Sequence, residues 1–231
     1  MTKIKGFLLG LLLLITGVVF GQGGADTIPS IEFQRQIFIY QLAKKYNDAT
    51  MVKTALYNIL SIYPSNTNIL DSLALMYFDY QQYASAALVS ADIVKMYPDD
   101  LLATEIAAIS FEQLGVKDRA LKYYEKLYLG NNSLALLYQI SFMQYSLKRI
   151  TEAEVNLDLL TGNAESENFT LIFPTTANDS QDVSLRAAAF RLRALIESEK
   201  GNKQAAKDLL KKALEIQPDF QVAKTELAKL N

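Results

Sequence analysis

Small apolar residues recur along this chain at regular intervals. Alanine occupies Ala74 and Ala86, and again Ala108 and Ala120, so that the two members of each pair are 12 residues apart. The second pair follows the first after 34 residues. Two antiparallel helices joined by a tight turn approach most closely near that turn, where only small side chains fit. The pattern therefore predicts a series of helix pairs.

Turn-forming residues mark the ends of the predicted helices. Pro64 and Pro98 are 34 residues apart in the similar settings SIYPSN and KMYPDD, and Asn132 follows after another 34. Proline cannot continue a helix, and Gly115 and Gly201 readily adopt the backbone conformation that ends one. A 34-residue period is typical of two-helix repeats that stack into a solenoid.

These residues resemble those of the tetratricopeptide repeat (TPR) family. The closest match is the run GNKQAAKDLLKKALEIQP from Gly201 to Pro218. The resemblance covers about residues 31–231 and implies an all-α fold, namely a TPR-type α-solenoid of about five helix pairs. A capping helix is expected at 219–231, where apolar residues are spaced to form one face. Such a pattern is specific for a fold and not for a function.

The repeat spacing is interrupted once. Asn132 and Pro218 are 86 residues apart, which is 18 more than two periods. The extra residues fall in an insertion at 161–183, where the segment FTLIF favours a β-strand. The sequence predicts a short β-hairpin formed by Asn168–Phe173 and Asp182–Leu185, with a disordered loop as the alternative.

Residues 1–21 have the layout of a secretory signal peptide. A short basic start is followed by an apolar run from Phe7 to Phe20 and by small residues before Gln22. The run has about 14 residues, fewer than the roughly 20 that cross a bilayer. Cleavage before Gln22 is therefore favoured over an uncleaved anchor and leaves no stable membrane span. We expect residues 22–30 to be mobile and the mature protein to be periplasmic, or alternatively secreted.

Composition restricts the chemistry of the chain. It has no cysteine and no histidine, which excludes disulfides, imidazole-based catalysis and zinc sites built on His and Cys. The net charge is −2, or −4 once Lys3 and Lys5 are removed with the signal peptide, and no long basic run suggests nucleic acid. We predict no catalytic residue, no metal and no cofactor. The acids Glu152, Glu154 and Asp158 are interpreted as a solvated helix face.

The resemblance also implies where a partner would bind. In the TPR family, the first helix of each repeat lines a concave groove, and its positions 2, 5, 9 and 12 point into that groove. The candidate partner-binding residues at such positions are Asp71, Leu75, Phe78, Glu105, Ile109, Glu112, Gln139 and Met143. They predict an apolar floor with acidic residues, which suits an extended or helical peptide carrying apolar anchors and some basic residues.

Three classes of function compete on this basis. The leading hypothesis is a non-enzymatic scaffold or adaptor of the cell envelope that binds proteins or peptides through the groove, the 161–183 insertion, or both. The alternative is a structural protein that self-associates into homo-oligomers. An enzyme built on acidic residues is the least favoured class. The end of the signal peptide resembles that of exported TPR proteins of Bacteroidota.

Overall fold

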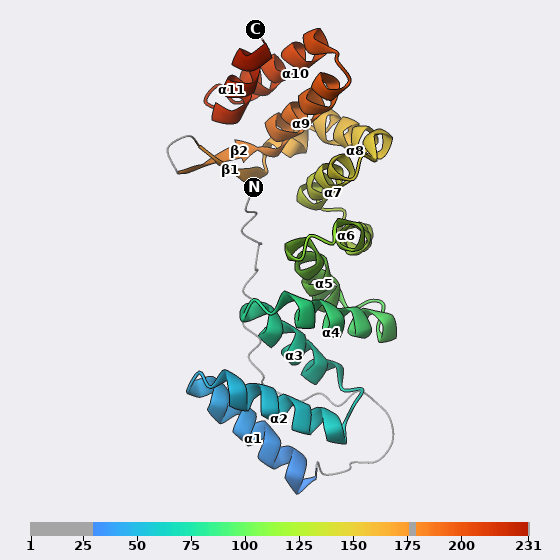
Figure 1. The fold of residues 1–231 in the computed structure, drawn as a ribbon, viewed down its shortest axis with the longest axis vertical. Coiled ribbons are helices and arrows are strands. Elements are labelled where there is room, and N and C mark those ends of the chain that lie inside the picture. Colours follow the sequence, from blue (N-terminus) through green and yellow to red (C-terminus); the bar gives the residue numbers. More distant parts are fainter. Residues whose placement is uncertain (1–29, 176–178, 231) are drawn as a thin grey trace. The chain divides into compact units, whose positions relative to one another are not determined.

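The computed structural model describes residues 30–175 and 179–230, which fold into helices and one small sheet (Figure 1). The predicted signal peptide and all of the predicted mobile segment except Ser30 lie outside the described residues. The helices are α1 (Ile31–Lys45), α2 (Ala49–Ile62), α3 (Thr67–Asp79), α4 (Tyr83–Met96), α5 (Leu101–Gln113), α6 (Lys117–Asn131), α7 (Leu134–Ser146), α8 (Ile150–Gly162), α9 (Leu185–Glu199), α10 (Lys203–Ile216) and α11 (Gln221–Leu230).

The described chain is all-α apart from one short β-hairpin, as the sequence predicts. Ten of these helices form five successive pairs, and α11 follows the fifth pair near the predicted capping position. The chain divides into two compact units, an N-terminal unit that ends at Ile106 and a C-terminal unit that starts at Ala107. The boundary falls inside α5. No helix of the described residues is long and apolar enough to cross a membrane.

The turn inside each helix pair contains one residue with a left-handed backbone. Glycine fills this position in two pairs, at Gly115 (φ 74°) and Gly201 (φ 85°). Asn47, Gln81 and Lys148 adopt the same conformation in the other pairs, with φ between 56° and 61°. A side chain makes this conformation costly, so these three turns are held by the helices on either side of them.

Alanines at the predicted close-approach positions are buried in both units. In the N-terminal unit, Ala74 of α3 and Ala86 of α4 are fully buried, and α3 packs along α4. In the C-terminal unit, Ala120 and Ala206 are equally buried. Large side chains complete each core, including Leu56, Ile59, Leu73 and Ile93 in the first unit and Leu157, Leu192, Leu210 and Phe220 in the second.

The insertion forms the predicted hairpin. Strand β1 (Thr170–Pro174) pairs antiparallel with β2 (Ser180–Ser184), and Leu171 lies opposite Val183. Before β1, a short 3₁₀ helix, η1 (Ala164–Glu167), follows α8. Strand residues alternate between buried and exposed, as expected when one face of a hairpin packs on a core.

Candidate partner-binding surfaces

Four of the candidate groove residues lie in the N-terminal unit. Asp71, Leu75 and Phe78 belong to α3, where spacings of four and three residues place them on one side of the helix. All three are half-buried. The ring of Phe78 packs edge-on against Tyr83, with 5.8 Å between ring centroids. Glu105 belongs to α5 and is exposed. This set offers partly accessible apolar side chains next to carboxylates.

The electrostatics of Asp71 are unusual among the described residues. Burial, together with the charge of the nearby Asp100 carboxylate and a hydrogen bond to it, raises the pKa of Asp71 to about 7. Asp100 caps the start of α5, where its Oδ1 accepts a hydrogen bond from the Ala103 amide at 2.9 Å. Among the described residues, Oδ1 of Asp71 is buried and has no hydrogen-bond partner. Oδ1 of Asp71 therefore has no compensating donor among the described residues.

The other four candidate residues lie in the C-terminal unit, where internal contacts hold most of them. The carboxylate of Glu112 accepts one hydrogen bond from the Tyr124 hydroxyl at 2.6 Å and another from Nε2 of Gln139 at 2.7 Å. Gln139 and Met143 are buried, whereas Ile109 and Glu112 are half-buried. In this unit, the predicted positions therefore contribute mainly to packing between α5, α6 and α7.

The acidic residues of α8 that suggested an enzyme are paired with cations. Glu154 bonds to Lys200, and Asp158 bonds to Arg193. Glu152 is paired with Arg149 three residues earlier on the chain. The described residues contain no group of three or more acidic side chains arranged to hold a metal ion. The α8 acids thus form a paired surface, in line with their interpretation as a solvated helix face.

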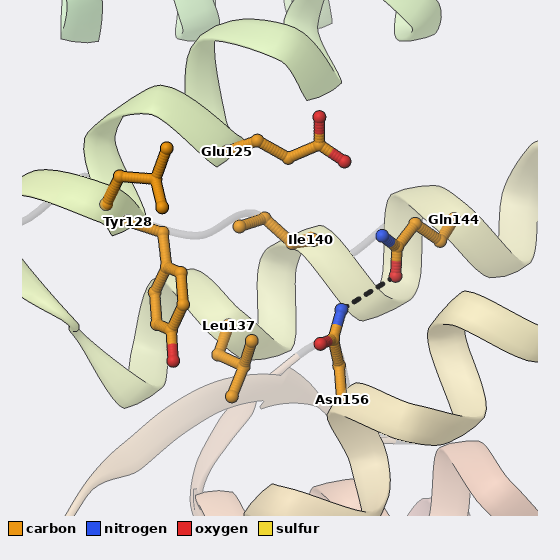
Figure 2. Close-up of a pocket in the computed structure, with 7 residues that line it drawn as sticks. Glu125, Tyr128, Leu137, Ile140, Gln144 and Asn156 are labelled. Carbon is orange, nitrogen blue, oxygen red and sulfur yellow. Dashed lines mark hydrogen bonds between the residues drawn. The ribbon is translucent and has the colours of Figure 1, made fainter.

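A shallow apolar pocket lies in the C-terminal unit, among α6, α7 and α8 (Figure 2). Its volume is about 230 Å³, and its lining residues are Glu125, Tyr128, Leu129, Leu137, Ile140, Gln144 and Asn156. Figure 2 shows a polar end where Nδ2 of Asn156 donates a hydrogen bond to Oε1 of Gln144 at 2.9 Å. The volume is below the roughly 300–1,000 Å³ of typical small-molecule sites.

The sequence did not point to this pocket. Among its lining residues, Leu129 of α6 is an exposed apolar residue. Leu129 lies on the second helix of its pair, whereas the family resemblance places a groove on the first helices.

The hairpin is anchored on the C-terminal core. Phe173 is only 2% exposed and packs edge-on against Phe220, with 5.1 Å between ring centroids. The side chain of Gln217 bridges the end of α10 to β2, because its Nε2 donates to the Asp182 carbonyl and its Oε1 accepts from the Ser184 amide, both at 2.7 Å. Among the described residues of this insertion, Phe169 is a partly exposed apolar side chain.

A partly buried ion pair supports the same region. The guanidinium of Arg191 on α9 donates several hydrogen bonds to the Glu226 carboxylate on α11, at 2.5–3.1 Å. The same guanidinium lies 5.7 Å from the centroid of the Phe173 ring. Glu226 raises the pKa of Arg191 despite the opposing effect of burial. The side chain of Arg191 on α9 therefore contacts both α11, through Glu226, and the hairpin, through the Phe173 ring.

No family model matches the sequence, and a search of curated protein sequences gave no match. Solved structures, in contrast, share the fold. The chain is similar to YrrB, described as a TPR protein with an unusual peptide-binding site, at 17% identity and a TM-score of 0.62 over 83% of this chain and 89% of that one. It is also similar to a tetratricopeptide repeat protein from Parabacteroides merdae, at 16% identity and a TM-score of 0.60 over 87% and 73% of the two chains.

A third similar structure is MamA from Desulfovibrio magneticus, at 10% identity and a TM-score of 0.57 over 83% of this chain and 98% of that one. All three identities are low, so the comparisons establish the fold alone. The chain has the fold of TPR proteins.

Proposed function

We propose that this protein is an exported member of the TPR family, similar to those of Bacteroidota, and a non-enzymatic protein-binding scaffold of the cell envelope. The TPR-type fold, the presence of a peptide-binding site in YrrB and the layout of residues 1–21 support this proposal. The fold presents long helix surfaces and contributes few convergent reactive groups. Binding is therefore the activity that suits it best.

The observation that carries the proposal is the half-buried carboxyl of Asp71, whose pKa is raised to about 7 and whose Oδ1 has no hydrogen-bond partner among the described residues. A carboxylate that loses water without gaining a cation is costly, and the cost is removed when a partner supplies one. A lysine or arginine side chain would ion-pair with Asp71, while Leu75 and Phe78 accept a neighbouring apolar residue. The preferred ligand is a peptide segment that combines basic and apolar residues.

The insertion offers a second contact for a partner, through its outer face alone. Phe169 is 47% exposed next to β1. Deletion of residues 161–183 would also remove Leu171, Phe173 and Val183 from the core. A loss of binding in such a variant could not be distinguished from a loss of folding. Substitution of Phe169 by Ala tests the contact and leaves the anchored face in place.

A peptide display experiment tests the proposal. The chain from Gln22 to Asn231 is immobilised and exposed to a random peptide library, and we expect enrichment of peptides that carry Lys or Arg beside large apolar residues. The Asp71→Lys variant should lose this enrichment, since it places a like charge at the site. The Asp208→Lys variant, changed at an exposed residue of α10, serves as the control and should retain it. Equal selection by both variants would refute the assigned site.

The pH dependence of binding provides a second test. Because the pKa of Asp71 is raised to about 7, the carboxyl is largely neutral at about pH 6 and largely ionised at about pH 8. Affinity for a selected basic peptide should therefore increase with pH over this range. The Asp71→Asn variant should bind weakly and show little change with pH.

A further inference from the structure

The pocket among α6, α7 and α8 contains a buried amide that is only half satisfied. Gln144 is 4% exposed, and its Oε1 accepts the hydrogen bond from Asn156. Its Nε2 has no hydrogen-bond partner among the described residues, although it is not sealed off from solvent. Figure 2 shows this nitrogen on the side of the Gln144 amide that faces the other lining residues. Buried polar groups are nearly always hydrogen-bonded, so this donor calls for an acceptor that the described residues do not supply.

Asn156 places a matching acceptor next to this donor. Its Nδ2 donates to Gln144, whereas its Oδ1 accepts no hydrogen bond from the described residues. The bond between the two side chains holds one free donor and one free acceptor close together. In an extended chain, the N–H and the C=O of one residue point to the same side. The backbone of a single extended residue therefore complements this pair.

The rest of the pocket is apolar and large enough for one side chain. Leu137 and Ile140 of α7 are buried, and Tyr128 of α6 is half-buried. A cavity of about 150 Å³ holds a benzene molecule, so the pocket volume of about 230 Å³ accommodates a large apolar side chain with its adjoining backbone. Leu129, which is 81% exposed, also lines the pocket and would be covered by such an occupant.

The charges at the pocket favour an uncharged occupant. Among the described residues that line it, Glu125 alone is charged. The guanidinium of Arg149, which also pairs with Glu152, lies 3.7 Å from the Glu125 carboxylate. Because Glu125 already has a cation beside it, it offers little attraction to another. This distinguishes the pocket from the Asp71 surface, which favours basic residues.

We propose that this pocket binds an extended segment of a partner protein through one large uncharged apolar side chain and the backbone of the same residue. The backbone C=O accepts from Nε2 of Gln144, and the backbone N–H donates to Oδ1 of Asn156. A helix cannot occupy the site in this way, because its backbone groups are bonded to one another. The inference rests on the proposed protein-binding function and not on the Asp71 site, which belongs to the other unit.

Titration with blocked amino acids, followed by NMR, tests the pocket directly. N-acetyl-leucinamide carries one apolar side chain and the backbone of one residue. The chain from Gln22 to Asn231 should bind it with a dissociation constant on the order of millimolar. The largest shifts should occur at the side-chain NH₂ of Gln144 and at the methyl groups of Leu137 and Ile140.

A smaller compound provides the control for the apolar contact. N-acetyl-alaninamide has the same backbone but lacks most of the apolar side chain, so it should bind roughly tenfold more weakly or less tightly still. Equal binding of the two compounds, or the absence of a shift at Gln144 with N-acetyl-leucinamide, would overturn the inference.

Three variants locate the binding site. Gln144→Met keeps the length of the side chain and removes its donor, so it should weaken binding of N-acetyl-leucinamide roughly threefold or more. Leu129→Ala shortens an exposed wall of the pocket with little risk to folding, and it should also weaken binding. Leu88→Ala changes an exposed leucine of α4 and is the matched control, which should bind like the unchanged chain. The same affinity in all three variants contradicts the assigned pocket.

Two further measurements separate this site from the Asp71 surface. Asp71→Lys should leave the binding of N-acetyl-leucinamide unchanged, so a failure of the peptide selection at Asp71 and a failure of the pocket are distinct results. N-acetyl-lysinamide should bind the pocket more weakly than N-acetyl-leucinamide. Tighter binding of the lysine compound would mean that Glu125 governs the site and would overturn the choice of an uncharged side chain.

Discussion

The protonation of Asp71 depends on a residue 29 positions further along the chain. Asp71 lies on α3, whereas Asp100 stands at the start of α5, and the fold brings the two carboxyl groups together. Burial and the negative charge of Asp100 both disfavour ionisation of Asp71, so its pKa rises from 3.8 to about 7. This residue should therefore contribute to how the stability of the protein changes with pH.

Stability should fall as the pH rises from about 4 to about 7. The folded protein keeps the Asp71 proton up to about pH 7, whereas the unfolded chain releases it near pH 4. The folded state therefore binds more protons over this range, and its free energy of unfolding decreases with pH. Asp71→Asn, which mimics the neutral form, should stabilise the protein by about 1–3 kcal/mol at pH 8 and by much less at pH 4. Urea denaturation at several pH values measures this difference.

The composition of the chain excludes histidine as a source of this pH dependence. No histidine is present to titrate between about pH 5 and 8. Asp208→Asn, at an exposed position of α10, is the control and should leave the pH profile unchanged. If Asp71→Asn gives the same gain in stability at every pH, the carboxyl is not neutral in the folded protein.

The turn residues show which features of single residues a sequence pattern can predict. Gly115 and Gly201 were predicted to end helices, and both have positive φ. The same backbone conformation occurs at Asn47, a residue type that tolerates it, and at Gln81 and Lys148, whose residue types do not favour it. The 34-residue period locates these turns, but tertiary packing imposes the left-handed conformation on residues that do not favour it.

At the scale of elements, the hairpin is part of the C-terminal core. Strand β1 inserts Leu171 and Phe173, and strand β2 inserts Val183, into a cluster that includes Phe220. Gln217 adds two hydrogen bonds to the backbone of β2. The insertion therefore stabilises the last helix pair in addition to any contact with a partner.

Two phenylalanines in the insertion give a matched test of this role. Phe173→Ala should destabilise the protein by about 3–5 kcal/mol, because it removes a fully buried ring and leaves a cavity. Phe169→Ala changes a side chain that is 47% exposed only a few residues away and should cost much less, about 1 kcal/mol or below. Urea denaturation of both variants measures the two losses in the free energy of unfolding. Similar small losses in both would mean that the hairpin is not anchored on the core.

The sequence predicted the strands but not how they pack. The predicted segments, Asn168–Phe173 and Asp182–Leu185, overlap the observed strands Thr170–Pro174 and Ser180–Ser184. Local β-propensity and turn residues are sufficient for that prediction. The bridge from Gln217 to Ser184 joins residues 33 positions apart, and no local pattern signals such a contact.

For the candidate groove residues too, the sequence predicted the local arrangement but not the contacts between helices. The period placed Asp71, Leu75 and Phe78 on one side of α3, and all three are partly accessible. It could not reveal that Glu112 is held by Tyr124 and Gln139, because those bonds depend on the packing of three helices. Whether the accessible positions bind a partner remains a prediction for the peptide experiment.

For the whole molecule, the two compact units imply that stability is local. In a repeat array each element contacts mainly its neighbours, so stability approximates a sum over repeats and their adjacent contacts. A substitution in one unit should then act chiefly on that unit. The core leucines and isoleucines provide suitable probes, since Ile59 of α2 and Leu192 of α9 are both fully buried.

Hydrogen exchange followed by peptide mass spectrometry can test this locality. Ile59→Ala and Leu192→Ala should each cost about 2–5 kcal/mol in their own surroundings. Ile59→Ala should accelerate amide exchange in α1–α4 and leave α9 and α10 largely protected, while Leu192→Ala should have the opposite effect. This pattern follows if segments open independently, with a free energy set by their own contacts. A uniform loss of protection over all helices in either variant would instead mean that the described chain unfolds as a single cooperative unit.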